Sequence, residues 1–184
     1  MKKLLLLTAL LSLAGIHAEA INIPENCTAF LTRKSMFFSD RVEVIGINCS
    51  QEIQLEEKNN RTVLTVKIPG DQFKTGNPKR NSVVGQVLGD KLIFTAELSL
   101  SQIQNLSTMQ KLQGMLKIKE KISPVSFKIS SEGRFLIGIY TSSLTDLSIT
   151  PPVAGPWDLI AKTHDTVTLG FKVDRAYFKK GELK

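Results

Sequence analysis

The chain has 184 residues, of which 42% are apolar and 22% charged, with 24 Lys and Arg against 17 Asp and Glu. This length favours one domain with a substantial core, and the apolar fraction excludes a disordered polyelectrolyte. With only two Cys, the chain is not a small scaffold held together by disulfides. One of its two His lies in the N-terminal leader described next, so a metal site of several His ligands is excluded.

The first twenty residues are typical of a secretory signal peptide. Lys2 and Lys3 supply the positive start, and residues 4–16 form an apolar stretch too short to span a bilayer comfortably. Ala and Glu then give a small-x-small cleavage pattern at residues 18–20. We therefore expect a mature domain of residues 21–184 that is periplasmic or secreted, with an uncleaved anchor helix as the alternative.

The two cysteines lie in a segment that predicts an antiparallel hairpin. If the strand that begins at Cys27 pairs with the strand that ends at Cys49, apolar residues face apolar residues and Arg33 faces Glu43. In an oxidising compartment such a pair more often forms a disulfide than stays free. A bridge would stabilise the fold by about 3 kcal/mol by constraining the unfolded chain. Two buried thiols are the alternative that the sequence leaves open.

From residue 61 onward, apolar and polar residues alternate with a period of two, which predicts strands with one dry and one wet face. Six such stretches cover residues 64–68, 92–100, 112–118, 125–129, 135–139 and 167–173. With the hairpin they make about eight antiparallel strands, which must close as a barrel or stack as a sandwich. Residues 69–91 and 143–165 are expected to be long loops with a short helical turn or two, and loops of this length are usually functional.

Three segments, in order along the chain, resemble motifs of one family. They are TGNPKR at residues 75–80, LQGMLKI followed by SPVSF between residues 112 and 127, and the stretch from residue 155 to 171 with LIAK and DTVTL. Together they are similar to the YceI-like family of bacterial exported proteins. The resemblance covers nearly all of residues 21–184. It implies an eight-stranded lipocalin-like antiparallel barrel that encloses a long apolar chain, such as a polyisoprenoid, an isoprenoid quinone tail or a fatty amide.

The alternation and the resemblance together suggest which residues line a cavity. A buried CH₂ group is worth roughly 0.8 kcal/mol, so a long apolar ligand needs no strict polar code. The small residues Ala96 and Gly114 are expected to leave space inside the barrel. A filled core would show the same alternation, so hollow and packed barrels both stay open. The residues expected on the cavity wall are Leu64, Val66, Phe94, Ala96, Leu98, Leu112, Leu116, Phe127, Phe135, Ile137, Ile139, Leu169 and Phe171.

Three residues of the long loops are candidates for the mouth of this cavity. Lys79 and Arg80 carry cations that suit an anionic head group, although simple solvation explains them equally well. Trp157 is expected to cap an open end or to pack within its own loop. The remaining basic residues suit transient contact with an anionic membrane surface and not a nucleic-acid groove, which needs interleaved aromatic residues.

We therefore expect a carrier or storage protein for a long-chain lipid, monomeric or homodimeric, without cofactor, metal or covalent chemistry. Phosphate-binding loops, nucleophile elbows and zinc-binding motifs are missing from the sequence. His164, beside Asp165, is the one His outside the leader. Carboxylates with shifted pKa values beside His164 in a cleft would favour an enzyme instead. A filled barrel that presents its basic surface to a membrane or to another exported protein is the main alternative to the carrier that the sequence leaves open.

Overall fold

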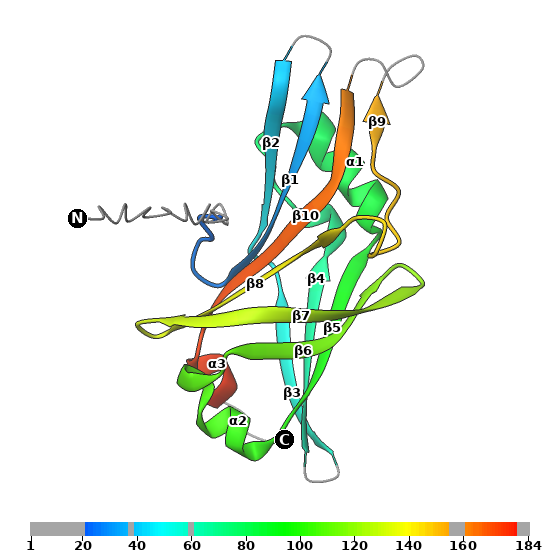
Figure 1. Ribbon diagram of the computed structural model, residues 1–184. Coiled ribbons are helices and arrows are strands. Elements are labelled where there is room, and N and C mark those ends of the chain that lie inside the picture. The colour runs from blue at the N-terminus through cyan, green and yellow to red at the C-terminus, as the bar shows by residue number, and fades with distance from the viewer. Residues whose placement is uncertain (1–20, 37–38, 59–60, 155–160, 180–184) are drawn as a thin grey trace, which may run out of the picture.

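The computed structural model describes residues 21–36, 39–58, 61–154 and 161–179. Over these residues the chain forms a curled antiparallel sheet in the order β2-β1-β10-β8-β7-β6-β5-β4-β3, with β9 paired to β10 (Figure 1). The strands are β1 (Cys27–Met36), β2 (Ser39–Asn48), β3 (Glu52–Lys58), β4 (Arg61–Pro69), β5 (Lys91–Leu98), β6 (Lys111–Ile118), β7 (Lys121–Glu132), β8 (Phe135–Ser143), β9 (Val153–Ala154) and β10 (Ala161–Asp174). The helices are α1 (Pro78–Leu88), α2 (Leu100–Gln104) and α3 (Ala176–Lys179), with 3-10 turns η1 (Gly70–Gln72) and η2 (Leu106–Thr108).

The predicted all-β, lipocalin-like fold is confirmed, and all six alternating stretches are strands. The expected number of eight strands is too low, because the described residues contain β3 and β9 as well. β3 lies at the edge of the sheet and reads EIQLEEK, with most of its charged side chains exposed. Charges on an edge strand discourage pairing with another chain, and they also hide the alternation. The fifth strand ends at Leu98 and not at residue 100, because Ser99 caps α2.

The long loop predicted over residues 69–91 contains an 11-residue helix, α1. Its sequence, PKRNSVVGQVL, is poor in strong helix formers, which explains why propensity did not reveal it. The helix begins because the side chain of Asn77 accepts a hydrogen bond from the backbone N–H of Arg80 and Pro78 occupies the first turn. Among the described helices, none has the length and apolar character needed to cross a membrane.

The N-terminal hairpin of β1 and β2 has the predicted register. Ala29 lies opposite Ile47, and Arg33 lies opposite Glu43. The guanidinium of Arg33 and the carboxylate of Glu43 are 3.3 Å apart on the surface. An exposed pair of this kind contributes little stability, so the apolar partners determine the register.

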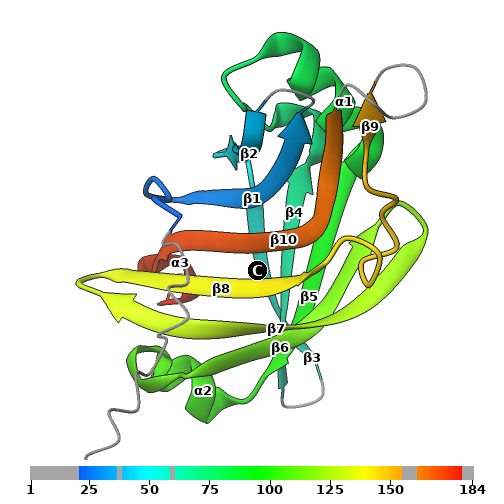
Figure 2. The ribbon, with the colours of Figure 1, turned by 45° about the horizontal axis from the view of Figure 1, so that its top comes forward.

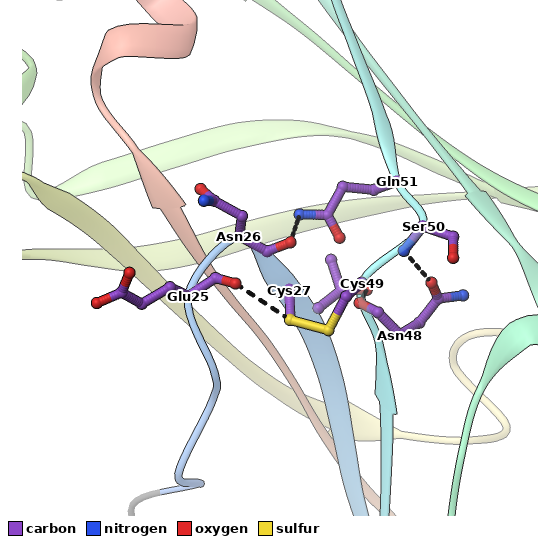
Figure 3. Close-up of a disulfide and its surroundings, with 8 residues drawn as sticks. Glu25, Asn26, Cys27, Asn48, Cys49, Ser50 and Gln51 are labelled. Atoms are coloured by element: carbon purple, nitrogen blue, oxygen red, sulfur yellow. Dashed lines mark hydrogen bonds between the residues drawn. A yellow bond between two sulfur atoms is a disulfide. The ribbon is translucent and has the colours of Figure 1, made fainter.

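The same register brings Cys27 beside Cys49, and the structure joins their sulfur atoms in a disulfide (Figure 3). Replacing both with Ala is expected to lower the free energy of unfolding by about 3 kcal/mol, because the 22-residue separation defines a loop that the bridge closes in the unfolded chain. Urea unfolding followed by circular dichroism measures the difference. A loss below about 1 kcal/mol would contradict this account.

Backbone contacts join the two ends of the sheet. Ile47 of β2 and Lys74, which follows η1, exchange hydrogen bonds of 3.0 and 2.8 Å between backbone N–H and C=O groups. The buried side chain of Asn48 donates from Nδ2 to the carbonyl oxygen of Pro69, at the end of β4, over 2.7 Å. These bonds tie β2 to the far side of the curled sheet, so the sheet encloses an interior.

The sheet buries apolar side chains on both of its faces. The main core lies inside the curl and receives residues from nearly every long strand. A smaller cluster lies on the outer face, where Ile21 and Ile23 pack against outward residues of β1 such as Ala29 and Leu31. Successive residues of a strand point to opposite faces, so β1 serves both clusters. The segment before β1 therefore covers the outside of the barrel.

Candidate functional site

A pocket of about 430 Å³ lies inside the barrel. Its wall is made by inward side chains of β1, β2, β3, β4, β5, β6, β7 and β10, by the helices α1 and α3 and by the segment between β8 and β9. The wall includes both Thr28 and Lys34, six residues apart on β1, which corresponds to ~20 Å along a strand. The pocket is thus long for its volume, within the range of small-molecule sites, and suits one extended chain better than a bulky ligand.

Many of the residues expected on a cavity wall do lie on the wall of this pocket. They are Leu64, Val66, Phe94, Leu112, Leu116, Phe127, Leu169 and Phe171. Ala96 and Leu98 are buried in the main core without lining the pocket. The pocket therefore occupies part of the interior, and packed side chains fill the rest of it.

On β8, the predicted face is wrong. Phe135, Ile137 and Ile139 lie on the outer face of the sheet, where Ile139 joins the outer cluster. The ring of Phe135 lies under two cations, with the guanidinium of Arg134 4.9 Å and the ammonium of Lys172 5.1 Å from its centre. The sequence FLIGIY is apolar at both alternate sets of positions, so period two could not identify the inner face.

The inward residues of β8 are instead Leu136, Gly138 and Tyr140. Leu136 is 2% exposed in the main core. The ring of Tyr140 packs 5.8 Å from the ring of Phe127. Gly138 lies opposite Phe171 on β10, whose ring covers it.

The expectation that Gly114 leaves empty space is also wrong. A Cβ atom built on Gly114 would lie 2.3 Å from the backbone oxygen of Thr95 and 2.5 Å from the ring of Phe94. Phe94 thus occupies the space that the missing side chain leaves. Two other inward glycines are covered by a neighbouring ring in the same way: Gly46 by Phe30 and Gly138 by Phe171.

One end of the pocket is cationic. Lys79 and Arg80, the predicted mouth residues, line it from the first turn of α1, and Lys34 lines it from β1. The described part of the wall contains no carboxylate. Lys34 was missed by sequence reasoning, although continuing the inward alternation of β1 past Phe30 would have found it. Trp157, the third predicted mouth residue, lies outside the described residues.

Hydrogen bonds hold Arg80 in place. Its Nε donates to the hydroxyl of Thr75 at 3.1 Å, and Nη2 donates to the Thr75 carbonyl oxygen at 3.3 Å. The backbone N–H and the hydroxyl of Thr75 in turn donate to Oδ1 of Asn81, at 2.8 and 2.7 Å. Gly76 adopts φ 75°, a conformation that favours glycine. The TGNPKR segment thus builds the start of α1 and presents a positioned cation at the pocket.

The segment between β8 and β9 closes another part of the wall with Leu144, Leu147 and Ile149, all buried. It is fixed by Thr145, whose hydroxyl and backbone N–H donate to the carboxylate of Asp165 at 2.7 and 2.9 Å. These hydrogen bonds lower the pKa of Asp165. This part of the expected long loop is therefore a packed wall of the pocket.

Gln51 lines the pocket near the start of β1, whereas Lys34 lines it near the other end of that strand. Figure 3 shows its side chain beside Asn26. Its Nε2 donates to the backbone oxygen of Asn26 at 2.7 Å. Its Oε1 is buried and, among the described side chains, is the one buried polar atom without a hydrogen-bond partner. A donor group at the inner end of a ligand would find an acceptor there. No sequence pattern identified Gln51.

His164 lies apart from the pocket wall. Its Nε2 is 2.7 Å from the hydroxyl of Ser35 on the surface. The carboxylate of the neighbouring Asp165 accepts hydrogen bonds from Thr145 and is exposed to solvent. The described residues contain no group of three His, Cys, Asp or Glu that could hold a metal ion. His164 and Asp165 therefore lie on the surface and do not line the pocket described above.

These features define a lipocalin-like barrel with an apolar internal pocket, and solved structures share its fold. BcnA from Burkholderia cenocepacia has a TM-score of 0.51 at 14% identity, over 79% of this chain and 94% of that chain. A polyisoprenoid-binding domain from Saccharophagus degradans, implicated in plant cell wall breakdown, has a TM-score of 0.50 at 10% identity, over 79% and 91%. No family model and no curated protein matches the sequence. The shared fold agrees with the resemblance of the motifs to the YceI-like family.

Proposed function

We propose that this chain is an exported carrier or storage protein that binds a long-chain lipid inside its barrel and performs no covalent chemistry. The observation that carries the proposal is the long, almost wholly apolar pocket with cations at one end. The neighbour from Saccharophagus degradans is described as a polyisoprenoid-binding domain, which supports a lipid ligand. A polyisoprenoid, an isoprenoid quinone or a fatty amide has the required shape.

The energetics of an apolar pocket favour a long ligand. Each buried CH₂ group contributes roughly 0.8 kcal/mol, so burial of about 15 such groups is worth about 12 kcal/mol before losses. Lost translational and rotational freedom takes back at least several kcal/mol. A long chain therefore binds usefully, whereas a short one does not. The extended shape of the pocket, from Thr28 to Lys34, accommodates such a chain.

The cationic end gives the ligand a direction. Lys34, Lys79 and Arg80 would hold an anionic or strongly polar head group at the mouth, since charge-assisted hydrogen bonds are the strong ones. Arg80 keeps donors beyond those bound to Thr75, because a guanidinium has five. The apolar tail would then extend toward Gln51.

The proposed export rests on residues 1–20, which lie outside the described residues, and on the disulfide. A bridge between Cys27 and Cys49 supports an oxidising compartment, because cytosolic proteins keep their thiols reduced. A periplasmic or secreted location is the proposal that agrees with both features.

Native mass spectrometry of the full chain expressed in a bacterial host, purified from the periplasm without detergent, tests this function. We expect one lipid-sized adduct per chain that organic extraction removes. The extracted protein should regain an adduct when incubated with a polyprenyl phosphate, ubiquinone or oleamide. A bare mass both before and after these incubations would overturn the carrier proposal and favour a filled structural or partner-binding barrel.

A further inference from the structure

The mouth of the pocket is surrounded by exposed apolar side chains. Met36, Val83 and Val153 are 40, 44 and 47% exposed. Val83 and Val153 both line the pocket, from α1 and β9. Met36 lies near Val153, because Met36 pairs with Ala161 of β10, and Ala161 pairs with Ala154, the residue after Val153 in β9. Figure 2 shows α1, β9 and the end of β1 at the same end of the barrel.

Cations lie among these apolar side chains. Lys34, Lys79 and Arg80 line the pocket at this end, and the exposed Lys162 lies opposite Val153 in the pairing of β9 and β10. We call these four cations and the three apolar residues Met36, Val83 and Val153 the mouth rim.

The mouth rim contains four cations and no carboxylate. Glu43, on β2, is paired with Arg33, whereas Asp165 keeps its negative charge and accepts hydrogen bonds from Thr145. The described wall of the pocket itself contains no carboxylate. The rim is thus both apolar and positively charged, a combination that partitions to an anionic lipid–water interface.

We propose that the mouth rim docks on an anionic lipid bilayer and opens the pocket toward it. The inference rests on the proposed function, because a lipid carrier must take its cargo from a membrane. An apolar chain that passes directly from the bilayer into the pocket avoids exposure to water. The other large exposed apolar side chains of the described residues include Leu100 of α2, at the opposite end in Figure 1, where the pocket has no cationic mouth.

Co-sedimentation with vesicles tests the docking. Wild-type protein is expected to bind vesicles of phosphatidylglycerol and phosphatidylcholine, to bind pure phosphatidylcholine at least tenfold more weakly, and to dissociate as salt is raised. The Met36→Asp/Lys162→Glu variant is expected to bind the anionic vesicles at least tenfold more weakly than wild type. Neither residue lines the pocket, and both are exposed, so folding is checked by thermal unfolding.

A matched control makes the same changes of charge and polarity away from the rim. Leu100→Asp/Lys111→Glu alters an exposed apolar residue and an exposed Lys near α2 and is expected to bind vesicles as wild type does. Docking by the mouth rim is overturned if the wild-type protein does not bind anionic vesicles, or if the rim variant and the control variant bind these vesicles equally well. Native mass spectrometry of the same samples separates the two proposals. If the protein binds vesicles but carries no lipid adduct, the carrier function is contradicted and docking by the mouth rim still stands.

Discussion

Replacing Val87 with Trp is expected to reduce the lipid adduct more than tenfold, whereas replacing Gln86 with Trp leaves it unchanged. Val87 lies on the wall of the pocket, and its neighbour Gln86 is exposed and does not line it. Both variants add the same indole to the same helix, so they share any effect on helix propensity. Only the first places the ring against the apolar pocket, where its volume displaces the ligand.

Native mass spectrometry of both variants, purified as the wild type is, measures the effect. α1 has no fully buried residue, so its inward side can accept a larger side chain at a cost of about 1–3 kcal/mol or less. Circular dichroism should therefore find both variants folded. An undiminished adduct on the Val87→Trp variant would place the ligand outside this pocket. Equal loss in both variants would attribute the effect to the helix and not to the cavity.

The second large effect concerns stability. Gly114→Val is expected to lower the free energy of unfolding by about 3 kcal/mol, at the upper end of the cost of overpacking. The first added carbon already conflicts with the backbone oxygen of Thr95, which cannot move without disturbing β5. The ring of Phe94 cannot yield easily either, because it packs edge-on against Phe127 with centres 5.5 Å apart.

Gln113→Val is the matched control for this substitution. Gln113 is the preceding residue of β6 and is exposed on the opposite face, so the added β-branched side chain should change the stability by less than about 1 kcal/mol. Urea unfolding of both variants gives the comparison. If Gly114→Val proved as stable as wild type, Phe94 would have to be able to leave its position, and the space beneath it would be available after all.

The sequence predicted the N-terminal hairpin well because several independent signals agreed there. Apolar partners, opposite charges and two cysteines matched in one register, and a slip by one residue would have broken all three. The strands β4, β5, β6, β7 and β10 were recognisable for a related reason, since each has one wet and one dry face. Where one face is not wet, as at FLIGIY in β8, the pattern identified a strand but not its inner side.

Other elements carried too little local signal. β3 is an edge strand with charged residues at most positions, and α1 has few strong helix formers among its Pro, Gly, Asn, Ser and Val residues. Both are stabilised by contacts with other elements: β3 pairs with β4, and α1 packs close to η1, where a Cβ atom added to Gly85 would lie 3.3 Å from the Cα of Asp71. Tertiary contacts thus overrode local propensity.

By itself, the sequence determined a set of antiparallel strands with an apolar inner face and the register that places Cys27 opposite Cys49, and its family resemblance pointed to a barrel. Only the tertiary structure decided how much of that interior stays open. The reason is geometric: whether a small residue leaves a cavity depends on what reaches it from the next strand, and Phe94 reaches Gly114. The cationic mouth was likewise decided in three dimensions, where Lys34 of β1 meets Lys79 and Arg80 of α1 around one opening.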